Sequence, residues 1–191
     1  WGQEYFSYHG QVFKYDQVRV TPKPLQEPYP ELWLGGMFPY TTRRAGRSGD
    51  AWCSDPFPIE KETWKSRVGM YREAADKAGN RAQVVLMRDG WVASSRAEAE
   101  KTFGRIYVDE TLFYFRHGIL NHHPDFRSES DFTVDACFQH AVAGTPQDCI
   151  EQLERYRQEY DVDYVIMRFR LPGVLDCLRL FGQEVLPKFQ G

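Results

Sequence analysis

The segment at residues 30–52, PELWLGGMFPYTTRRAGRSGDAW, constrains the fold of this chain more than any other part of its sequence. An apolar run ending at Leu34 leads through Gly35 and Gly36 to Pro39, and a second apolar run begins at Ala51. Proline is suited to the first position of a helix, because its missing N–H would have no partner there. A strand that passes through glycines into a helix presents backbone N–H groups to an anionic ligand. The segment therefore predicts a strand–turn–helix unit with an anion site at the turn.

Apolar runs and helical patterns alternate along the rest of the chain, which favours a parallel sheet with helices outside it. Residues 5–20 alternate apolar and polar side chains and predict a hairpin, and the proline-rich residues 21–30 predict an extended connector. Further strands are expected at residues 50–54, 83–93 and 163–170. Helices are expected at residues 60–78, 95–117, 145–160 and 175–189, with a capping box at Ser95 and Glu98 and an N-cap at Thr145. Residues 121–131 are polar and predict an exposed loop.

Four passages together resemble the bacterial-luciferase-like flavin-dependent monooxygenases. They are the segment at residues 30–52, YHGQVF at 8–13 leading into TPKPLQEP at 21–28, AGTPQD at 143–148, and LFGQEVLP at 180–187. The resemblance implies an α/β fold of the (β/α)8 TIM-barrel type. A complete barrel takes about 250 residues, and this chain has 191 and begins at Trp1. We therefore expect one domain, residues 1–191, that forms the carboxyl-terminal half to two-thirds of a barrel, with a hairpin or extended insertion at residues 1–29.

The same resemblance implies an oxidoreductase, most simply a flavoprotein monooxygenase that uses reduced FMN and O2 to oxygenate a small organic substrate. A separate flavin reductase and a homo-oligomeric state are implied as well. One alternative is a hydride-transferring enzyme that uses a deazaflavin coenzyme, and another is a non-catalytic flavin-binding relative. Catalytic side chains in this family come largely from the first half of the barrel, so no residue of this chain is assigned as catalytic.

The resemblance implies cofactor contacts at Gly35, Gly36, Met37 and Phe38. Many relatives have small hydroxyl residues after the glycines, whereas this chain has Met37 and Phe38. The expected contacts to the cofactor phosphate are therefore backbone N–H groups alone. Thr41 and Thr42 either supply hydroxyl contacts in their place or line the helix.

Arg168 and Arg170 are two residues apart at the end of the last expected strand, and so lie on one face of it. Because ligands bind at the carboxyl ends of barrel strands, these arginines could hold an anionic substrate or the cofactor phosphate bidentately. The alternative is an ion pair with Asp161, Asp163 or an acid on a helix. Three further arginines follow the glycine pair and are expected on a solvated helix face: Arg43, Arg44 and Arg47.

The histidines and cysteines do not predict a metal site. His117, His122, His123 and His140 lack the close pairing with cysteines or acids that zinc sites usually show, and a loop histidine that donates to substrate is the alternative role. The cysteines form no CxxC pair, which predicts reduced thiols and a cytoplasmic protein. Cys53 is either a reactive thiol at the barrel mouth or a small buried side chain. A net charge of −3 gives no indication of a nucleic-acid partner, and no apolar run is long enough to indicate a membrane partner.

Overall fold

The computed structural model describes residues 1–120, 123–170 and 172–190. They divide into two compact units, Trp1–Leu32 and Trp33–Gly191. The smaller unit holds an antiparallel hairpin of β1 (Phe6–His9) and β2 (Lys14–Val18), as the alternating pattern predicted. The proline-rich residues that follow form no helix or strand.

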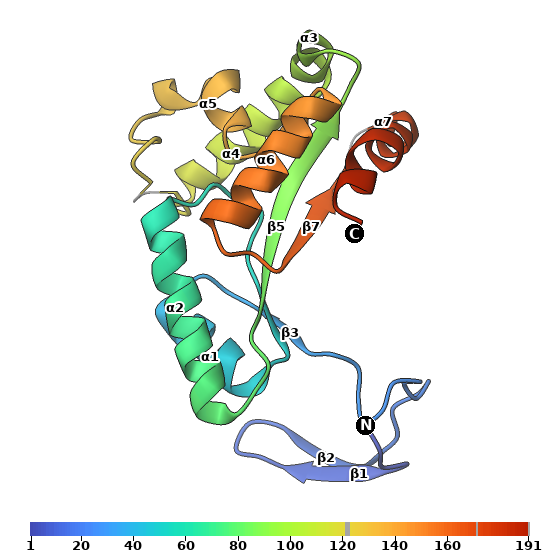
Figure 1. Ribbon diagram of the computed structural model, residues 1–191. Helices are drawn as coiled ribbons and strands as arrows, with labels where there is room; N and C mark the ends of the chain where they lie inside the picture. Colours follow the sequence, from blue (N-terminus) through green and yellow to red (C-terminus); the bar gives the residue numbers. More distant parts are fainter. Residues whose placement is uncertain (121–122, 171, 191) are drawn as a thin grey trace. The chain divides into compact units, whose positions relative to one another are not determined.

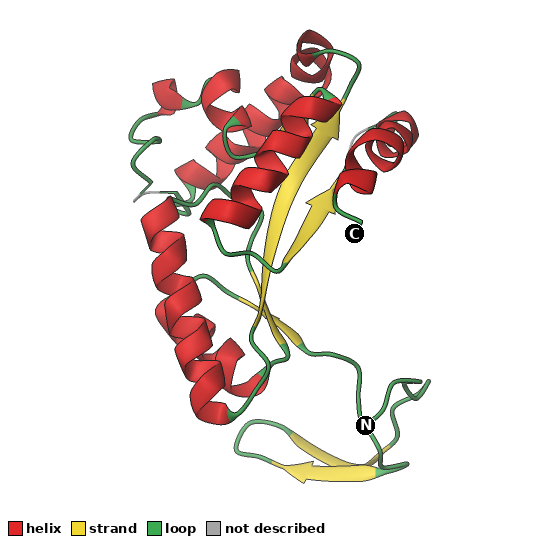
Figure 2. Cartoon of the chain, viewed as in Figure 1, coloured by secondary structure: helices red, strands yellow, loops and turns green. Residues whose placement is uncertain are grey.

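The larger unit is built on a parallel sheet, whose strands appear in Figures 1 and 2. β3 (Trp33–Gly35) pairs with β4 (Ala51–Cys53), β4 with the start of β5 (Gln83–Val92), and β7 (Tyr164–Arg168) with the middle of β5. A short additional strand, β6 (Val142–Gly144), pairs with the last three residues of β5. Four parallel strands in the order β3–β4–β5–β7 thus form the body of the sheet.

Helices follow the strands, as expected for repeated β/α units. In chain order they are α1 (Pro39–Ser48), α2 (Lys61–Ala78), α3 (Arg96–Ala99), α4 (Arg105–Arg116), α5 (Val134–Phe138), α6 (Pro146–Glu159) and α7 (Val174–Leu180). Four short helical pieces complete the described structure: the π-helical η1 (Glu100–Gly104) and η3 (Phe181–Val185), and the 3₁₀ turns η2 (Glu129–Asp131) and η4 (Leu186–Lys188). Among the helices of the described residues, none is long and apolar enough to cross a membrane.

Capping residues explain where the two longest helices begin. The Glu60 carboxylate accepts hydrogen bonds from the first-turn N–H groups of α2, and Gly79 ends that helix in the left-handed conformation. Thr145 and Asp148 form a reciprocal capping box at the start of α6. At α3 the expected box is only half formed: Ser95 accepts from the Glu98 N–H, but the Glu98 carboxylate bonds to Ser94.

The two faces of the sheet differ in their surroundings. Alternate strand residues such as Trp52, Leu86 and Met167 belong to the core beneath the helices. On the opposite face, Trp33 of β3 and Tyr164 of β7 bring their ring centroids to 5.5 Å. Two strands lie between them, and neighbouring strands are about 4.8 Å apart. The sheet must therefore curve toward this inner face, as it does in a barrel.

Several sequence expectations need correction. The helix expected at residues 95–117 is interrupted by a π-helical turn, and the one expected at 175–189 changes to π and 3₁₀ geometry after Leu180. The last strand ends at Arg168, so Arg170 lies beyond it. The segment expected as an exposed loop is partly core: Phe126 is fully buried and His123 is 7% exposed. Asn121 and His122 lie outside the described residues.

Candidate functional site

Chemically active side chains gather at the carboxyl ends of the parallel strands. The register pairs Gly35 with Cys53, Cys53 with Val85, and Asp89 with Arg168. All these strands run the same way, so the segments that follow them emerge on one edge of the sheet. In parallel α/β sheets this edge is the usual place for a ligand.

The two glycines at the turn after β3 differ in the space that surrounds them. Gly36 has φ +126°, and a Cβ added to it would lie 2.5 Å from the Thr41 hydroxyl, so the turn itself requires glycine. The Gly36 carbonyl is fixed by the Trp52 indole N–H at 2.8 Å. Gly35, by contrast, has only the Cys53 carbonyl within 4 Å of an added Cβ, at 3.8 Å. The space beside Gly35 is therefore available to a ligand.

The start of α1 is suited to an anion through its main chain. The N-cap residue Phe38 makes no side-chain capping bond, and the first turn contains no acidic residue. The Phe38 side chain is 77% exposed, which leaves this helix end accessible. The Thr41 and Thr42 hydroxyls bond to the carbonyls of Phe38 and Gly36, so both help to hold the turn. Helix N-termini with unpaired N–H groups favour negative charge.

The three arginines of α1 do not take part in this candidate anion site. Arg43, Arg44 and Arg47 are all exposed, as expected for a solvated helix face. Arg43 and Arg47 line a shallow depression together with Glu73 and Lys77 of α2.

An apolar cavity of about 170 Å³ adjoins the turn. Its wall is mostly apolar, with two carboxylates and one imidazole among the lining side chains. The lining residues are Met37, Asp55, Phe57, Pro58, Ile59, Glu60, Thr63, Ile119, Leu120 and His123. Arg67 holds the turn side of this cavity by donating to the Met37 carbonyl at 2.8 Å. Met37 thus belongs both to the glycine turn and to a pocket of the size of a small organic group.

Asp55 is a half-buried acid in the wall of this cavity. It follows β4, and its Oδ1 accepts a hydrogen bond from the Phe57 N–H at 3.2 Å. Burial raises the pKa of Asp55 above its ordinary value, against the opposing effects of Arg88, the Phe57 N–H and Arg168. Asp55 therefore holds a proton more readily than an exposed aspartate does.

Arg168 and Arg170 form an ion-pair cluster on the inner face of the sheet. Arg168 binds Asp89 bidentately, with Nε–Oδ1 at 2.9 Å and Nη2–Oδ2 at 2.7 Å. Arg170 contacts Asp89 at 3.2 Å and also pairs with Glu110 of α4. Asp89 is 2% exposed, so its charge depends on these partners. The ion-pair alternative is therefore realised: Glu110 is the expected acid on a helix, whereas the second acid is Asp89 of β5 rather than Asp161 or Asp163.

Arg88 points the other way, into the helix layer. It is 1% exposed, and its Nε donates to the Tyr156 hydroxyl at 3.1 Å, which in turn donates to the His140 carbonyl at 2.9 Å. Arg88 also donates to the carbonyls of Met87 and Asp55. The buried arginine therefore links the segment after β4 to α6 and to the chain before β6.

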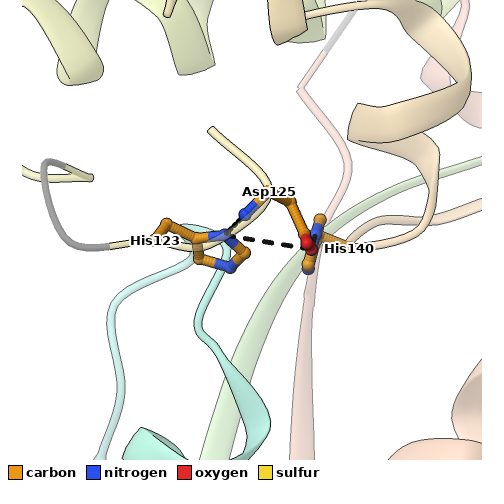
Figure 3. Close-up of side chains that lie close together, drawn as sticks. All are labelled: His123, Asp125 and His140. Atoms are coloured by element: carbon orange, nitrogen blue, oxygen red, sulfur yellow. Dashed lines mark hydrogen bonds and ion pairs between the residues drawn. The ribbon is translucent and has the colours of Figure 1, made fainter. Parts of the chain in front are cut away.

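The structure brings together two histidines that the sequence left separate. His123 and His140 lie beside Asp125, as Figure 3 shows. His117 lies apart from them on the surface, where its Nδ1 lies 2.7 Å from the Phe113 carbonyl oxygen. His122 lies outside the described residues. Asp125 stands two residues after His123 in the sequence, a pairing that was overlooked, and nothing in the spacing indicated that His140 would join them.

The thiols are unpaired, as predicted. All four cysteines are free, three of them are buried, and Cys53 is half-buried. Burial raises the pKa of Cys53, and the nearby Asp55 adds to this effect. A protonated thiol is a weak nucleophile, so the geometry favours the role of a small packed side chain.

The sequence pattern alone did not identify Asp55, Asp89 and Glu110 as members of this site. Asp55 and Asp89 stand directly after or near the end of apolar strand runs, and a charge at such a position was the available signal. Glu110 carries no such signal, because only the packing of α4 brings it to Arg170.

Comparisons with known proteins show which sequences and folds this chain resembles. A family model described as luciferase-like monooxygenase matches residues 1–161. The oxygenase component of a flavin-dependent trigonelline monooxygenase from Acinetobacter baylyi is 23% identical over 163 residues, which are 79% of this chain and 45% of the relative. An FMNH2-dependent dimethylsulfone monooxygenase from Pseudomonas putida is 33% identical over 94 residues, 47% of this chain and 25% of the relative. The chain thus spans less than half the length of these relatives.

Solved structures show the same fold. The monooxygenase RslO1 from Streptomyces bottropensis superposes with a TM-score of 0.77 at 19% identity, over 99% of this chain and 57% of that one. A coenzyme F420-dependent tetrahydromethanopterin reductase from Methanopyrus kandleri superposes with a TM-score of 0.68 at 18% identity, over 96% and 58%.

Proposed function

The chain belongs to the luciferase-like monooxygenase family, and from that premise we propose that it forms the carboxyl-terminal part of a (β/α)8 barrel which binds reduced FMN and oxygenates a small organic substrate with O2. The observation that carries the proposal is the meeting of three features at one sheet edge. They are the glycine turn before α1, the apolar cavity beside Met37, and the arginine cluster on Asp89.

The residues at this edge fit the phosphate end of a flavin. Space remains beside Gly35 where a side chain would otherwise project. The N-terminus of α1 has no side-chain cap from Phe38 and no acid in its first turn. We assign the phosphate to the main-chain N–H groups from Gly36 to Phe38, where a helix start favours negative charge. Bound reduced flavin supplies the electrons that activate O2.

The remaining residues position groups and exclude water. The cavity lined by Met37, Phe57 and Leu120 accepts the apolar part of a substrate. Asp89 holds Arg168 in one orientation on the inner face, so that Arg168 can face an anionic group of substrate or cofactor. Asp55 can hold a proton at its carboxylate within the cavity wall.

This proposal also includes the remainder of the barrel, a homo-oligomeric assembly, a cytoplasmic location and a separate flavin reductase. The reductase is supported by the description of the Acinetobacter relative as an oxygenase component.

The structural likeness to an F420-dependent reductase favours a second candidate, hydride transfer with a deazaflavin coenzyme on the same barrel. The two candidates differ in which reduced cofactor binds and in whether O2 is consumed. A non-catalytic flavin-binding protein would bind the cofactor without consuming O2 for any substrate.

Anaerobic titration of the chain with reduced FMN and, separately, with reduced deazaflavin coenzyme tests the proposal. We expect saturable binding of reduced FMN that weakens at least about tenfold in Gly35→Val, because the new side chain fills the space beside the phosphate. Preferential binding of the reduced deazaflavin would instead support the second candidate. Binding of neither cofactor would overturn both.

Gly69→Ala is the matched control. Gly69 lies on α2 with nothing within 4 Å of an added Cβ, so cofactor affinity should stay unchanged. Gly36 is unsuitable for this purpose, because its substitution would disturb the turn against Thr41.

A further inference from the structure

We propose that His123, Asp125 and His140 form a binding site for a divalent transition-metal ion of the zinc type. The side chains converge from two segments: His123 and Asp125 follow α4, and His140 lies between α5 and β6. In Figure 3 the Asp125 carboxylate lies beside the His140 ring, and the His123 ring faces it. The proposed flavin chemistry gives this cluster no role, although His123 also lines the cavity assigned to the substrate.

The spacing of the donor atoms suits one small ion. His140 Nε2 and Asp125 Oδ2 are 3.3 Å apart, and His123 Nδ1 is 3.9 Å from the same oxygen. Each of the three residues offers one ligand atom, and these three atoms lie within 4.8 Å of one another. Zinc bonds to nitrogen and oxygen are about 2.0–2.2 Å, which places tetrahedral ligands about 3.3 Å apart. The His140–Asp125 pair already has this separation, and the His123–Asp125 pair is longer by about half an ångström.

Both histidine rings of the cluster are buried, whereas the Asp125 carboxylate is open to solvent. The side chains of His123 and His140 are 3% and 9% exposed, whereas that of Asp125 is 60% exposed. The rings pack against each other at 4.9 Å and against Phe126. Two preorganised imidazoles behind an exposed carboxylate leave a path for an ion from solvent and room for a water as fourth ligand.

The imidazoles are in the form that coordinates a metal. Burial lowers the pKa of His140 to about 3, and the charges of His123, Arg88 and Arg155 act in the same direction. Burial also lowers the pKa of His123, against the opposing effects of Asp125 and Glu60. Neutral rings present a nitrogen lone pair without losing a proton first.

One buried nitrogen of the cluster lacks a hydrogen-bond partner. His123 Nδ1 accepts a 3.2 Å hydrogen bond from the Asp125 N–H, so Nε2 carries the proton. Among the described residues no hydrogen-bond partner lies within reach of that Nε2, although the Ile59 carbonyl is near enough to raise the pKa of the ring. Ligating histidines usually donate their second N–H to a carbonyl. A metal at Nδ1 would replace the weak bond from Asp125 and leave Nε2 to donate to Ile59.

The donor set also predicts selectivity. Two imidazoles and one carboxylate suit zinc and its neighbours, whereas Mg²⁺ and Ca²⁺ prefer oxygen ligands. Arg88 and Arg155 place positive charge near His140 and will weaken binding of any cation. The ordinary alternative is a plain hydrogen bond from His140 to Asp125, which predicts no metal binding.

Calorimetric titration of the chelator-treated chain with Zn²⁺, and separately with Mg²⁺, tests the site. We expect one Zn²⁺ per chain, no Mg²⁺ binding, and a Zn²⁺ affinity at least about tenfold weaker in Asp125→Asn and in His140→Gln. His117→Gln is the control, since that exposed histidine lies apart from the cluster, and it should bind Zn²⁺ like the unaltered chain. Absence of Zn²⁺ binding, or equal affinity in Asp125→Asn, would overturn the proposal.

A second measurement covers the case in which His140→Gln fails to fold. Asp125 is exposed, so Asp125→Asn should keep the fold, and its melting temperature can be compared with and without Zn²⁺. We expect Zn²⁺ to raise the melting temperature of the unaltered chain and not that of Asp125→Asn. X-ray absorption of the Zn²⁺-loaded chain should show two imidazoles, and a spectrum with sulfur ligands or without imidazole would refute the assignment.

Discussion

At the scale of single residues, Asp55 gives a prediction with a definite sign in pH. Burial holds the pKa of Asp55 in the folded chain above the ordinary value of 3.8. The folded state then binds more protons than the unfolded state, so this residue makes stability fall as pH rises from about 3.8 through the folded pKa. Asp55→Asn keeps the oxygen that accepts from Phe57 and removes the buried charge. We expect it to be more stable than the unaltered chain at pH 7, with the difference vanishing at low pH.

Urea denaturation at several pH values measures this difference. Asp125→Asn is a useful comparison, because that carboxylate is exposed and no burial penalty is relieved by its removal. If Asp55→Asn is instead the less stable protein at pH 7, the attraction of Arg88 and Arg168 for the carboxylate outweighs the penalty of burial.

Single residues also show which features of the site the sequence could predict and which it could not. The glycine pair identified the turn after β3, and the φ of Gly36 shows why glycine is needed there. The pattern could not separate Gly36, which shapes the turn, from Gly35, which leaves space for a ligand. Likewise, it placed Arg168 and Arg170 on one face but could not name Asp89 and Glu110 as partners. Such pairings depend on the packing of strands and helices far apart in the chain.

At the scale of elements, the start of α6 gives the next prediction. Thr145 accepts from the Asp148 N–H at 3.2 Å, and the Asp148 carboxylate accepts from the Thr145 N–H at 2.8 Å. Removing such a cap costs about 1 kcal/mol. Thr145→Ala should therefore lower the free energy of unfolding by about 1 kcal/mol, measured by urea denaturation, whereas Thr145→Ser should lower it by only a few tenths. An equal loss in both variants would assign the effect to the threonine methyl group instead.

The elements themselves were predicted where local signals are strong. The helix at α2 has apolar spacing, a cap at Glu60 and a glycine stop at Gly79, and its observed bounds match the expectation within one residue. The long strand β5 was equally clear. The short elements α5 and β6 were missed, because a three-residue strand has too few side chains to show alternation. Phe126 was misjudged for another reason, since its burial comes from packing against Phe132 within a polar stretch.

At the scale of the whole molecule, the inner face of the sheet is the part that the proposed barrel would complete. Trp33 and Tyr164, which touch across this face, are 36% and 49% exposed. On the face beneath the helices, by contrast, Trp52 is fully buried. In a closed barrel the inward side chains are packed in layers. The exposure of Trp33 and Tyr164 therefore fits the proposed barrel, in which further strands would cover this face.

An amino-terminal half-barrel from a full-length family member, supplied in trans, should cover this face. In a Trp1→Phe background Trp33 is the most exposed of the remaining tryptophans, because Trp52, Trp64 and Trp91 are buried. We expect acrylamide quenching of tryptophan fluorescence to fall when the half-barrel binds, and to stay unchanged in a chain that also carries Trp33→Phe. A half-barrel that binds, as judged by sedimentation, without protecting Trp33 would mean that this face is not the barrel interior. Protection would place Gly35 and Arg168 on the wall of a closed site, since they lie on the same face of their strands as Trp33 and Tyr164.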